Sequence, residues 1–164
     1  MPTSLPPVVD DRTRVLVLGS MPGEMSLRMQ QYYAHPRNAF WRIMNDIIGV
    51  DVQADYPRRL EALRSAGIGL WDVLSFCERS GSLDSAIARD TMEANDFEAL
   101  FTQYPGITRV FFNGAAAEQA FVRLVAPRID LSVKWSRLPS TSPANAAMPY
   151  DAKLRAWRSV LDVR

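Results

Sequence analysis

The sequence predicts an α/β fold, a three-layer α/β/α sandwich with a four-stranded, mostly parallel central sheet. Short apolar runs typical of strands alternate with segments of helical periodicity along the whole chain, and no internal repeat occurs. The 164 residues are 48% hydrophobic, which suits one domain with a substantial core. Residues 1–11 are rich in Pro and Ser without periodicity, so we expect a flexible leader there and a single domain over residues 12–164.

Four segments are predicted as strands. Residues 14–19, RVLVLG, are almost wholly apolar and end at glycine, which is typical of a central strand buried on both faces. Residues 67–73 (GIGLWDV) and 107–113 (ITRVFFN) are also mostly apolar and are predicted as the second and third strands. Residues 131–138 alternate between apolar and polar side chains, which indicates an edge strand.

Helices are predicted between these strands. Over residues 38–48 the apolar side chains fall on one face, and Gly49 marks the end of the helix. Asn95 or Asp96 is placed to cap a helix that ends near residue 104. The remaining predicted segments are helices over residues 57–65, 114–125 and 150–162, and an irregular polar stretch over 76–94 with a short helical turn near 84–88.

The composition excludes several classes of protein. No stretch approaches the roughly 20 uninterrupted apolar residues that a membrane span needs. The N-terminus, MPTSLPPVVDDR, lacks the pattern of a secretory signal, so we expect a cytoplasmic protein. Cys77 is the single cysteine, which excludes an internal disulfide, an all-cysteine iron–sulfur cluster and a zinc finger. Because metal-ligand spacings and glycine-rich cofactor motifs are absent from the sequence, we expect no metal and no cofactor.

The formal net charge of +1 hides a segregation of charge along the chain. Residues 12–45 carry a net charge of +4, residues 46–104 carry −6 and residues 123–164 carry +5. If the two basic segments meet in the fold, they form a positive face able to follow phosphates. An unevenly charged, solvated surface without a partner is the alternative.

The segments rich in Gly and polar residues fall at the ends of predicted strands. They are Gly19–Gly23, Asn113–Gly114 and Pro139–Asn145. Parallel sheets bind their ligands at the carboxyl ends of the strands, so these three segments are predicted to form one site.

Each candidate segment has a functional and a structural interpretation. Backbone N–H groups of the Gly19–Gly23 loop can stabilise an anion, although a strand-to-helix turn also uses Gly and Pro. In YYAHPRNAFW a tyrosine can stack on a base and Arg37 can touch a phosphate, whereas Asn38 suits a helix N-cap. The amide of Asn113 can read a base edge or occupy a turn. The hydroxyls of residues 140–142 can contact phosphate or simply stiffen a polar loop.

In this order, the motifs GSMPG, YYAHPRNAFW, FFNG and LPSTSPANA resemble the uracil-DNA glycosylase superfamily over about residues 12–148. The hypoxanthine- (deoxyinosine-) DNA glycosylase branch is the most similar, and the first two motifs also resemble the mismatch-specific uracil/thymine enzymes. The resemblance implies a four-stranded parallel sheet between helices. It also implies that water cleaves the N-glycosidic bond of a nucleotide flipped out of the duplex.

The resemblance implies a role for Asn38 as the catalytic residue. Mismatch-specific relatives carry a catalytic Asn, and uracil-specific ones an Asp, where this chain has Met21. Met21 can neither orient nor activate water. In the hypoxanthine branch the role belongs to the Asn of the H-P-x-N motif, which matches Asn38. Asn38 would position the attacking water through its carbonyl oxygen and can still cap the helix.

The same resemblance assigns the remaining site residues. The base-binding residues would be Gly19, Ser20, Met21, Pro22, His35, Tyr33, which stacks on the base, and Asn113, which reads its edge. The DNA-contacting residues would be Arg37, Ser140, Thr141, Ser142 and Asn145. Asn145 and Met148 are the candidates for the wedge that fills the vacated stack.

We therefore expect a base-excision repair glycosylase that releases hypoxanthine, and also uracil or xanthine, from DNA. Its partner would be DNA containing deaminated bases, with no membrane, and it would act as a monomer at the nucleoid of a prokaryote. Lys134 and Lys153 are poorly placed for a Schiff base, which favours a monofunctional enzyme. Two alternatives stay open: a non-catalytic nucleic-acid-binding module with a vestigial base pocket, and a hydrolase of small nucleosides or nucleotides.

Overall fold

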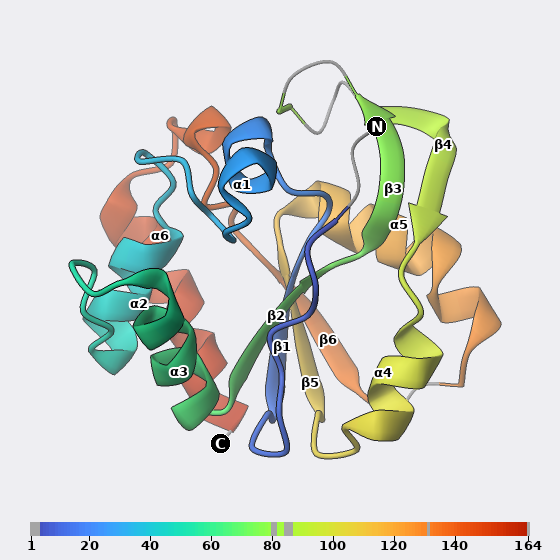
Figure 1. Ribbon diagram of the computed structural model, residues 1–164, viewed down its shortest axis with the longest axis horizontal. Coiled ribbons are helices and arrows are strands. Elements are labelled where there is room, and N and C mark those ends of the chain that lie inside the picture. Colours follow the sequence, from blue (N-terminus) through green and yellow to red (C-terminus); the bar gives the residue numbers. More distant parts are fainter. Residues whose placement is uncertain (1–3, 80–81, 84–86, 131, 164) are drawn as a thin grey trace.

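The central sheet has four parallel strands in the order β2-β1-β5-β6. A computed structural model describes residues 4–79, 82–83, 87–130 and 132–163 (Figure 1). The strands of this sheet are β1 (Val15–Gly19), β2 (Ile68–Asp72), β5 (Arg109–Asn113) and β6 (Lys134–Leu138). β1 is buried along its whole length between β2 and β5, and β6 lies at an edge, as its alternating side chains predict. The predicted fold class is confirmed.

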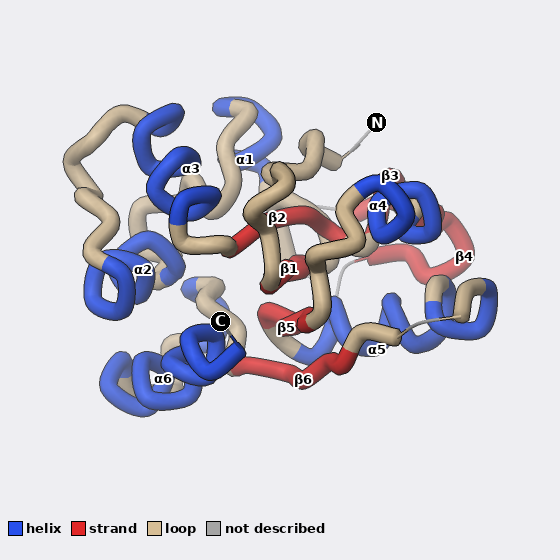
Figure 2. Tube along the Cα trace, turned by 90° about the horizontal axis from the view of Figure 1, so that it is seen from below, coloured by secondary structure: helices blue, strands red, loops and turns tan. Residues whose placement is uncertain are grey.

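Helices cover both faces of the sheet and complete three layers (Figure 2). On one face lie α2 (Phe40–Ile48), α3 (Tyr56–Ser65) and α6 (Tyr150–Trp157), and on the other lie α4 (Phe97–Gln103) and α5 (Ala115–Leu124). Side chains of β1 alternate between the layers. Val15 and Val17 pack in the core beneath α2, α3 and α6, whereas Leu16 and Leu18 pack in the core beneath α4 and α5.

The helix boundaries largely follow the predicted ones. Asp96 caps α4 by accepting a hydrogen bond from the Ala99 N–H at 3.0 Å, and Gly49 ends α2 with a φ of 76°. α2 begins at Phe40, two residues later than predicted. The short helices that were not predicted are α1 (Glu24–Met29) and the 3-10 segments Ala126–Arg128 and Pro143–Asn145. The last helix was predicted over residues 150–162, but α6 ends at Trp157 and the chain continues as a 3-10 helix over Arg158–Val163.

The prediction of an irregular stretch over residues 76–94 is wrong. The chain forms an antiparallel pair there, β3 (Leu74–Arg79) and β4 (Ile87–Ala94), and Cys77 and Ile87 pack in the core beneath α4 and α5. Register shifts on either side of Phe76 break the strict alternation, which hides the pair from a search for period-2 patterns. Residues 84–86 of the predicted helical turn lie outside the described residues, and Ile87 and Ala88 belong to β4.

The prediction of a flexible leader is also wrong from Ser4 onward. Val8 pairs with Leu70 of β2 through two backbone hydrogen bonds of 2.9 and 3.0 Å. A Cβ at Gly69 would lie 2.9 Å from the Val8 carbonyl oxygen, so this close approach requires glycine. Leu5 and Val8 are buried, and their apolar side chains extend the core beneath α2, α3 and α6.

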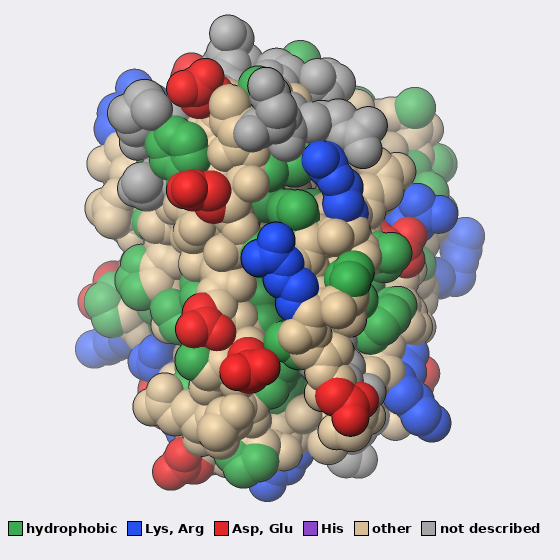
Figure 3. Space-filling model, turned by 90° about the vertical axis from the view of Figure 1, so that its right-hand side faces the viewer, with side chains coloured by type: hydrophobic (Ala, Val, Ile, Leu, Met, Phe, Trp, Pro, Cys, Tyr) green, Lys and Arg blue, Asp and Glu red, His purple; other side chains and the backbone are tan. Residues whose placement is uncertain are grey.

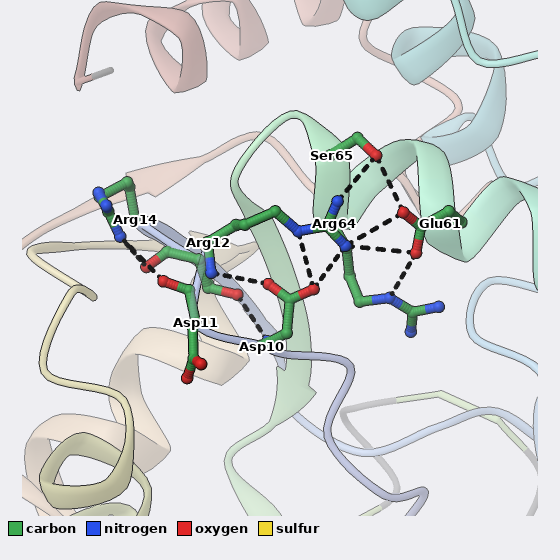
Figure 4. A network of polar contacts seen from close by, with 8 residues as sticks. Asp10, Asp11, Arg12, Arg14, Glu61, Arg64 and Ser65 are labelled. Atoms are coloured by element: carbon green, nitrogen blue, oxygen red, sulfur yellow. Dashed lines mark hydrogen bonds and ion pairs between the residues drawn. The ribbon is translucent and has the colours of Figure 1, made fainter.

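A surface network fixes the start of the domain to α3 (Figure 4). The Arg12 guanidinium pairs with Asp10 at 2.6 Å and with Glu61 of α3 at 3.1 Å, and it also donates to the Ser65 hydroxyl at 3.2 Å. The hydrogen bond from Arg12 holds the pKa of the Asp10 carboxyl below its ordinary value. The network orients the N-terminal segment where it turns into β1.

The two basic segments predicted from the charge distribution meet in the fold. α2 lies beside α6 (Figure 1), and the Arg42 guanidinium of α2 sits 3.6 Å from the ring centre of Tyr150 of α6. The face around α4, α5 and β4 instead carries acidic side chains scattered among basic ones (Figure 3). In the part of the chain that the structure describes, no helix is long and apolar enough to cross a membrane.

Candidate active site

A cavity of about 420 Å³ lies at the carboxyl end of the sheet, next to α1. This volume falls within the range of about 300–1,000 Å³ found for small-molecule sites. All but one of the predicted site residues line it, namely Gly19, Ser20, Met21, Pro22, Tyr33, His35, Arg37, Asn38, Asn113, Ser140, Thr141 and Ser142. Asn145 lines the adjacent groove instead. The structure therefore brings the predicted segments together.

The turn after β1 forms one wall of the cavity. Its backbone is tied to the start of the β3 segment, because the Val73 N–H donates to Gly19 and the Leu74 N–H donates to Ser20, at 2.8 and 3.0 Å. Met21 is only 6% exposed and packs in the core beneath α4 and α5. An apolar side chain held in the core cannot position water, so the turn offers its backbone to a ligand.

Tyr33 lines the cavity in an uncommon backbone conformation. Its φ of 55° lies in the left-handed region that side-chain-bearing residues rarely adopt. Its ring stacks on Phe40, with ring centres 4.2 Å apart and planes 28° apart. Strained residues of this kind persist where the surrounding structure over-determines them, and they cluster at functional sites. The stacking fixes the plane of an aromatic wall against which a second flat ring can lie.

Residues 35–38 form a tight turn that presents Asn38 at the cavity. The Asn38 N–H donates to the His35 carbonyl at 2.9 Å, and the Asn38 Oδ1 accepts from the Phe40 N–H at 2.9 Å. Asn38 therefore satisfies one of the unbonded N–H groups at the start of α2, although the N-cap itself is Ala39. A carbonyl oxygen accepts two hydrogen bonds, so one lone pair of Oδ1 remains for a water molecule.

The same turn sets the protonation pattern of His35. Its Nδ1 accepts a hydrogen bond from the Arg37 N–H at 3.1 Å. In a neutral imidazole the other nitrogen then carries the proton, so the His35 Nε2 is a donor beside the cavity. Arg37 itself is exposed at the cavity rim, where a guanidinium can reach a phosphate.

Asn113 is bonded twice to Thr141. The Asn113 Nδ2 donates to the Thr141 hydroxyl and the Asn113 Oδ1 accepts from the Thr141 N–H, both at 2.9 Å. Thr141 is 1% exposed. The prediction that Thr141 contacts DNA is therefore not supported, since a buried side chain cannot reach a phosphate at the surface. The amide of Asn113 keeps one N–H and one lone pair for other partners.

The neighbouring hydroxyls are arranged as donors. The Ser140 Oγ accepts from the Ser142 N–H and the Ser142 Oγ accepts from the Ala144 N–H, both at 3.2 Å. Because each oxygen is already an acceptor, its own O–H is available to donate outward. Asn145 braces the same loop by donating to the Ser140 carbonyl at 3.0 Å. The Ser140 and Ser142 hydroxyls are thus a preformed pair of donors on either side of the buried Thr141.

Asp72 is a site residue that the sequence analysis missed. It ends β2, is 3% exposed and lines the cavity. Tyr32 also lines the cavity. Burial, and secondarily the charge of Asp72, raise the pKa of the Tyr32 hydroxyl, so this hydroxyl stays neutral. A carboxylate in the lining of the cavity is an acceptor for ring N–H groups. The signal that could have found it is its position, a lone acid at the carboxyl end of a predicted parallel strand.

The described residues contain no group of three or more His, Cys, Asp or Glu side chains arranged to hold a metal ion.

Comparisons with known proteins show the family to which the chain belongs. A family model described as "Uracil DNA glycosylase superfamily" matches residues 6–161. A protein named hypoxanthine DNA glycosylase from Methanosarcina barkeri is 47% identical over 110 residues, which cover 66% of this chain and 68% of the relative. A protein of the same name from Methanosarcina acetivorans is 40% identical over 141 residues, covering 85% of each chain.

The fold is also matched by a solved structure. The solution NMR structure of a candidate uracil DNA glycosylase from Methanosarcina acetivorans superposes with a TM-score of 0.82 at 33% identity, covering 99% of both chains. Fold and site together define a DNA N-glycosylase, an enzyme that hydrolyses N-glycosyl bonds. The chain belongs to the uracil DNA glycosylase superfamily, as its motifs predicted.

The Gly19→Ala variant tests how tightly the cavity is built. A Cβ at Gly19 would lie 2.6 Å from the Asp72 Oδ1 and 3.6 Å from the Tyr33 hydroxyl, so the Asp72 side chain would have to move. We expect base release to slow by about 10²-fold, the scale for a displacement of about 1 Å at a reacting centre. Single-turnover kinetics and thermal unfolding measure this. Full activity at unchanged thermal stability would contradict the close packing of Gly19 on Asp72.

Proposed function

We propose that this protein is a base-excision repair glycosylase that releases hypoxanthine from DNA. The observation that carries the proposal is the convergence of Tyr33, Asn38 and the Gly19–Gly23 turn on one cavity at the carboxyl end of the sheet. The names of both curated relatives support hypoxanthine as the base. Uracil and xanthine are further candidate substrates, because each also carries a ring N–H beside a carbonyl group.

The cavity residues fit a hydrolytic mechanism. Water held by the free lone pair of the Asn38 Oδ1 attacks C1′ of the flipped nucleotide as the bond from C1′ to the base breaks. The sugar passes through an oxocarbenium-like state and the base departs with the bonding electrons. Backbone N–H groups near Gly19–Met21 stabilise the departing base, and Tyr33 stacks on its ring. The oxygen of the attacking water becomes the hydroxyl on C1′, and the proton that the water loses ends on the departing base anion, so that neutral hypoxanthine is released.

Asp72 is suited to read the base. Hypoxanthine presents an N–H at ring position 1, where adenine presents only a lone pair. A buried carboxylate accepts from that N–H and faces a lone pair when adenine enters, which favours the deaminated base.

The rim of the cavity is suited to hold the flipped nucleotide's backbone. The O–H groups of Ser140 and Ser142 and the guanidinium of Arg37 are the phosphate contacts that we propose. Met148 is 36% exposed beside the adjacent groove, and so it is a better wedge than Asn145, which braces the loop. Flipping costs a few kcal/mol and is easiest for mispaired bases, which adds selectivity.

We propose a monofunctional enzyme that acts as a monomer without metal or cofactor. Neither Lys134 of β6 nor the buried Lys153 of α6 is among the described residues that line the cavity, and the steps above require only water. The proposed groups all come from one chain. Since its substrate is chromosomal DNA, the enzyme would act in the cytoplasm at the nucleoid.

Labelled duplexes carrying a single inosine, uracil or xanthine test the function. After treatment with protein in buffer containing EDTA and then with alkali, we expect strand breaks at the modified position, strongest for inosine. A duplex without a modified base is the control. The absence of an abasic product from every duplex would refute the glycosylase, and release of base only from free nucleosides would favour the small-molecule hydrolase.

The Asn38→Ala variant tests the catalytic role. We expect base release to fall by at least about 10²-fold, the scale for losing one positioned polar group. Loss of the hydrogen bond to the Phe40 N–H should lower the free energy of unfolding by only about 1 kcal/mol. Asn45→Ala is a matched control, because Asn45 lies on α2 and bonds the Val50 carbonyl away from the cavity. Activity retained in Asn38→Ala would reduce Asn38 to a capping residue.

The Asp72→Leu variant tests base reading. We expect hypoxanthine release to slow by about 10- to 10²-fold, because a charge-assisted hydrogen bond contributes roughly 1.5–3 kcal/mol. Asp72→Asn keeps an acceptor and should fall between Asp72→Leu and the native enzyme. Affinity for a duplex with an abasic site, which has no base to read, should not change. An equal loss in abasic-site binding and in base release would show that Asp72 is structural.

A further inference from the structure

The loop of residues 140–142 is hydrogen-bonded to the sheet and also to the residue that follows Asn38. On one side, Thr141 forms two hydrogen bonds of 2.9 Å with the Asn113 amide: its hydroxyl accepts from the Asn113 Nδ2, and its N–H donates to the Asn113 Oδ1. On the other side, the Thr141 carbonyl accepts from the N–H of Ala39 at 3.0 Å. Ala39 is the residue directly after Asn38. Asn113, Thr141 and Ala39 therefore form a continuous chain of hydrogen bonds from the end of β5 to the start of α2.

This chain of bonds fixes the position of Asn38. The Ala39 and Phe40 N–H groups lie at the start of α2, where no carbonyl of the helix can accept them. Thr141 accepts the first and the side chain of Asn38 accepts the second. Thr141 is 1% exposed, so water cannot replace it without opening the fold. The place of the Asn38 carbonyl thus depends on the place of the Thr141 backbone.

The other end of this chain of hydrogen bonds, hereafter the link, is the end of β5, and it is held in place by the loop and by β6. The Gly114 N–H donates to the Leu138 carbonyl at 3.0 Å, which joins the end of β5 to the strand that leads into the loop. Gly114 has a φ of 97°, and a Cβ there would lie 3.1 Å from the Cβ of Ser140. The loop is therefore packed against the turn between β5 and α5. A shift of Ser140 would also move its neighbour Thr141.

We propose that Asn113 and Thr141 are positioning residues that couple the DNA-contacting hydroxyls to the catalytic asparagine. This inference rests on the proposed function. Ser140 and Ser142 flank Thr141, so phosphates bound by their O–H groups set the loop, and the loop sets Asn38 through the Ala39 N–H. The main task of the Asn113 amide is then to hold Thr141, whereas the sequence predicted that it reads the base. Water is held for attack only where the backbone of the flipped nucleotide is engaged.

Substitution of Asn113 separates the two roles. In Asn113→Asp one carboxylate oxygen still accepts from the Thr141 N–H, and the other accepts from the Thr141 hydroxyl, which now donates. The link survives, but a residue without an N–H cannot donate to a base carbonyl. In Asn113→Ala both bonds are lost. Thr141→Ser keeps the whole link and Thr141→Val removes only the hydroxyl bond.

The experiment measures single-turnover release of hypoxanthine from an inosine duplex, and affinity for a duplex with an abasic site. For Asn113→Ala we expect release to slow by about 10²-fold, the cost of a small misplacement of a reacting group, with affinity little changed. Asn113→Asp, which keeps both bonds to Thr141, should recover most of this loss. Thr141→Val should be slower than Thr141→Ser, and it gives the same comparison if Asn113→Ala does not fold.

Two results would overturn the coupling. If Asn113→Asp is as slow as Asn113→Ala, the amide contacts the base directly. If Asn113→Ala and Thr141→Val release base at the native rate, the link does not position Asn38. Failure of the proposed function would look different, because the native enzyme itself would then release no hypoxanthine.

Discussion

The site depends on the burial of β1 on both of its edges and both of its faces. A strand with no exposed position must satisfy its backbone N–H and carbonyl groups within the protein, and β1 pairs with β2 on one side and with β5 on the other. Since all three run parallel, their carboxyl ends meet at one edge. Gly19, Asp72 and Asn113 are the last residues of these three strands, and the cavity lies among them.

Around these strand ends, the protein works mainly with neutral groups held in place by hydrogen bonds. The side-chain oxygens of Asn38, Ser140 and Ser142 each accept a hydrogen bond from a backbone N–H, which fixes their orientation. A lone pair of the Asn38 oxygen and the O–H groups of the two serines remain for a ligand. Such preorganised dipoles stabilise developing charge without reorganising during the reaction. In the mechanism that we propose, Asn38 positions the water, so the turn after β1 needs no acid or amide and can carry Met21.

Sequence patterns predicted the features that local chemistry determines. The apolar runs gave the strands of the main sheet, the alternation in residues 131–138 placed β6 at an edge, and Asp96 marked the start of α4. The β3–β4 pair was missed because its register shifts disturb the alternation. Asp72 and the burial of Thr141 were missed for another reason. Whether a single polar residue points into a cavity or into the protein is decided by distant segments.

A crystal structure with a duplex that carries a non-hydrolysable analogue of deoxyinosine would show whether the base binds at the carboxyl ends of β1, β2 and β5. We predict that the hypoxanthine ring lies in the cavity against Tyr33, with a ring N–H toward Asp72 and the sugar beside Asn38. Phosphates on either side of the flipped nucleotide should contact Ser140 and Ser142. A base that remains stacked in the duplex, or that binds away from the carboxyl ends of β1, β2 and β5, would contradict it.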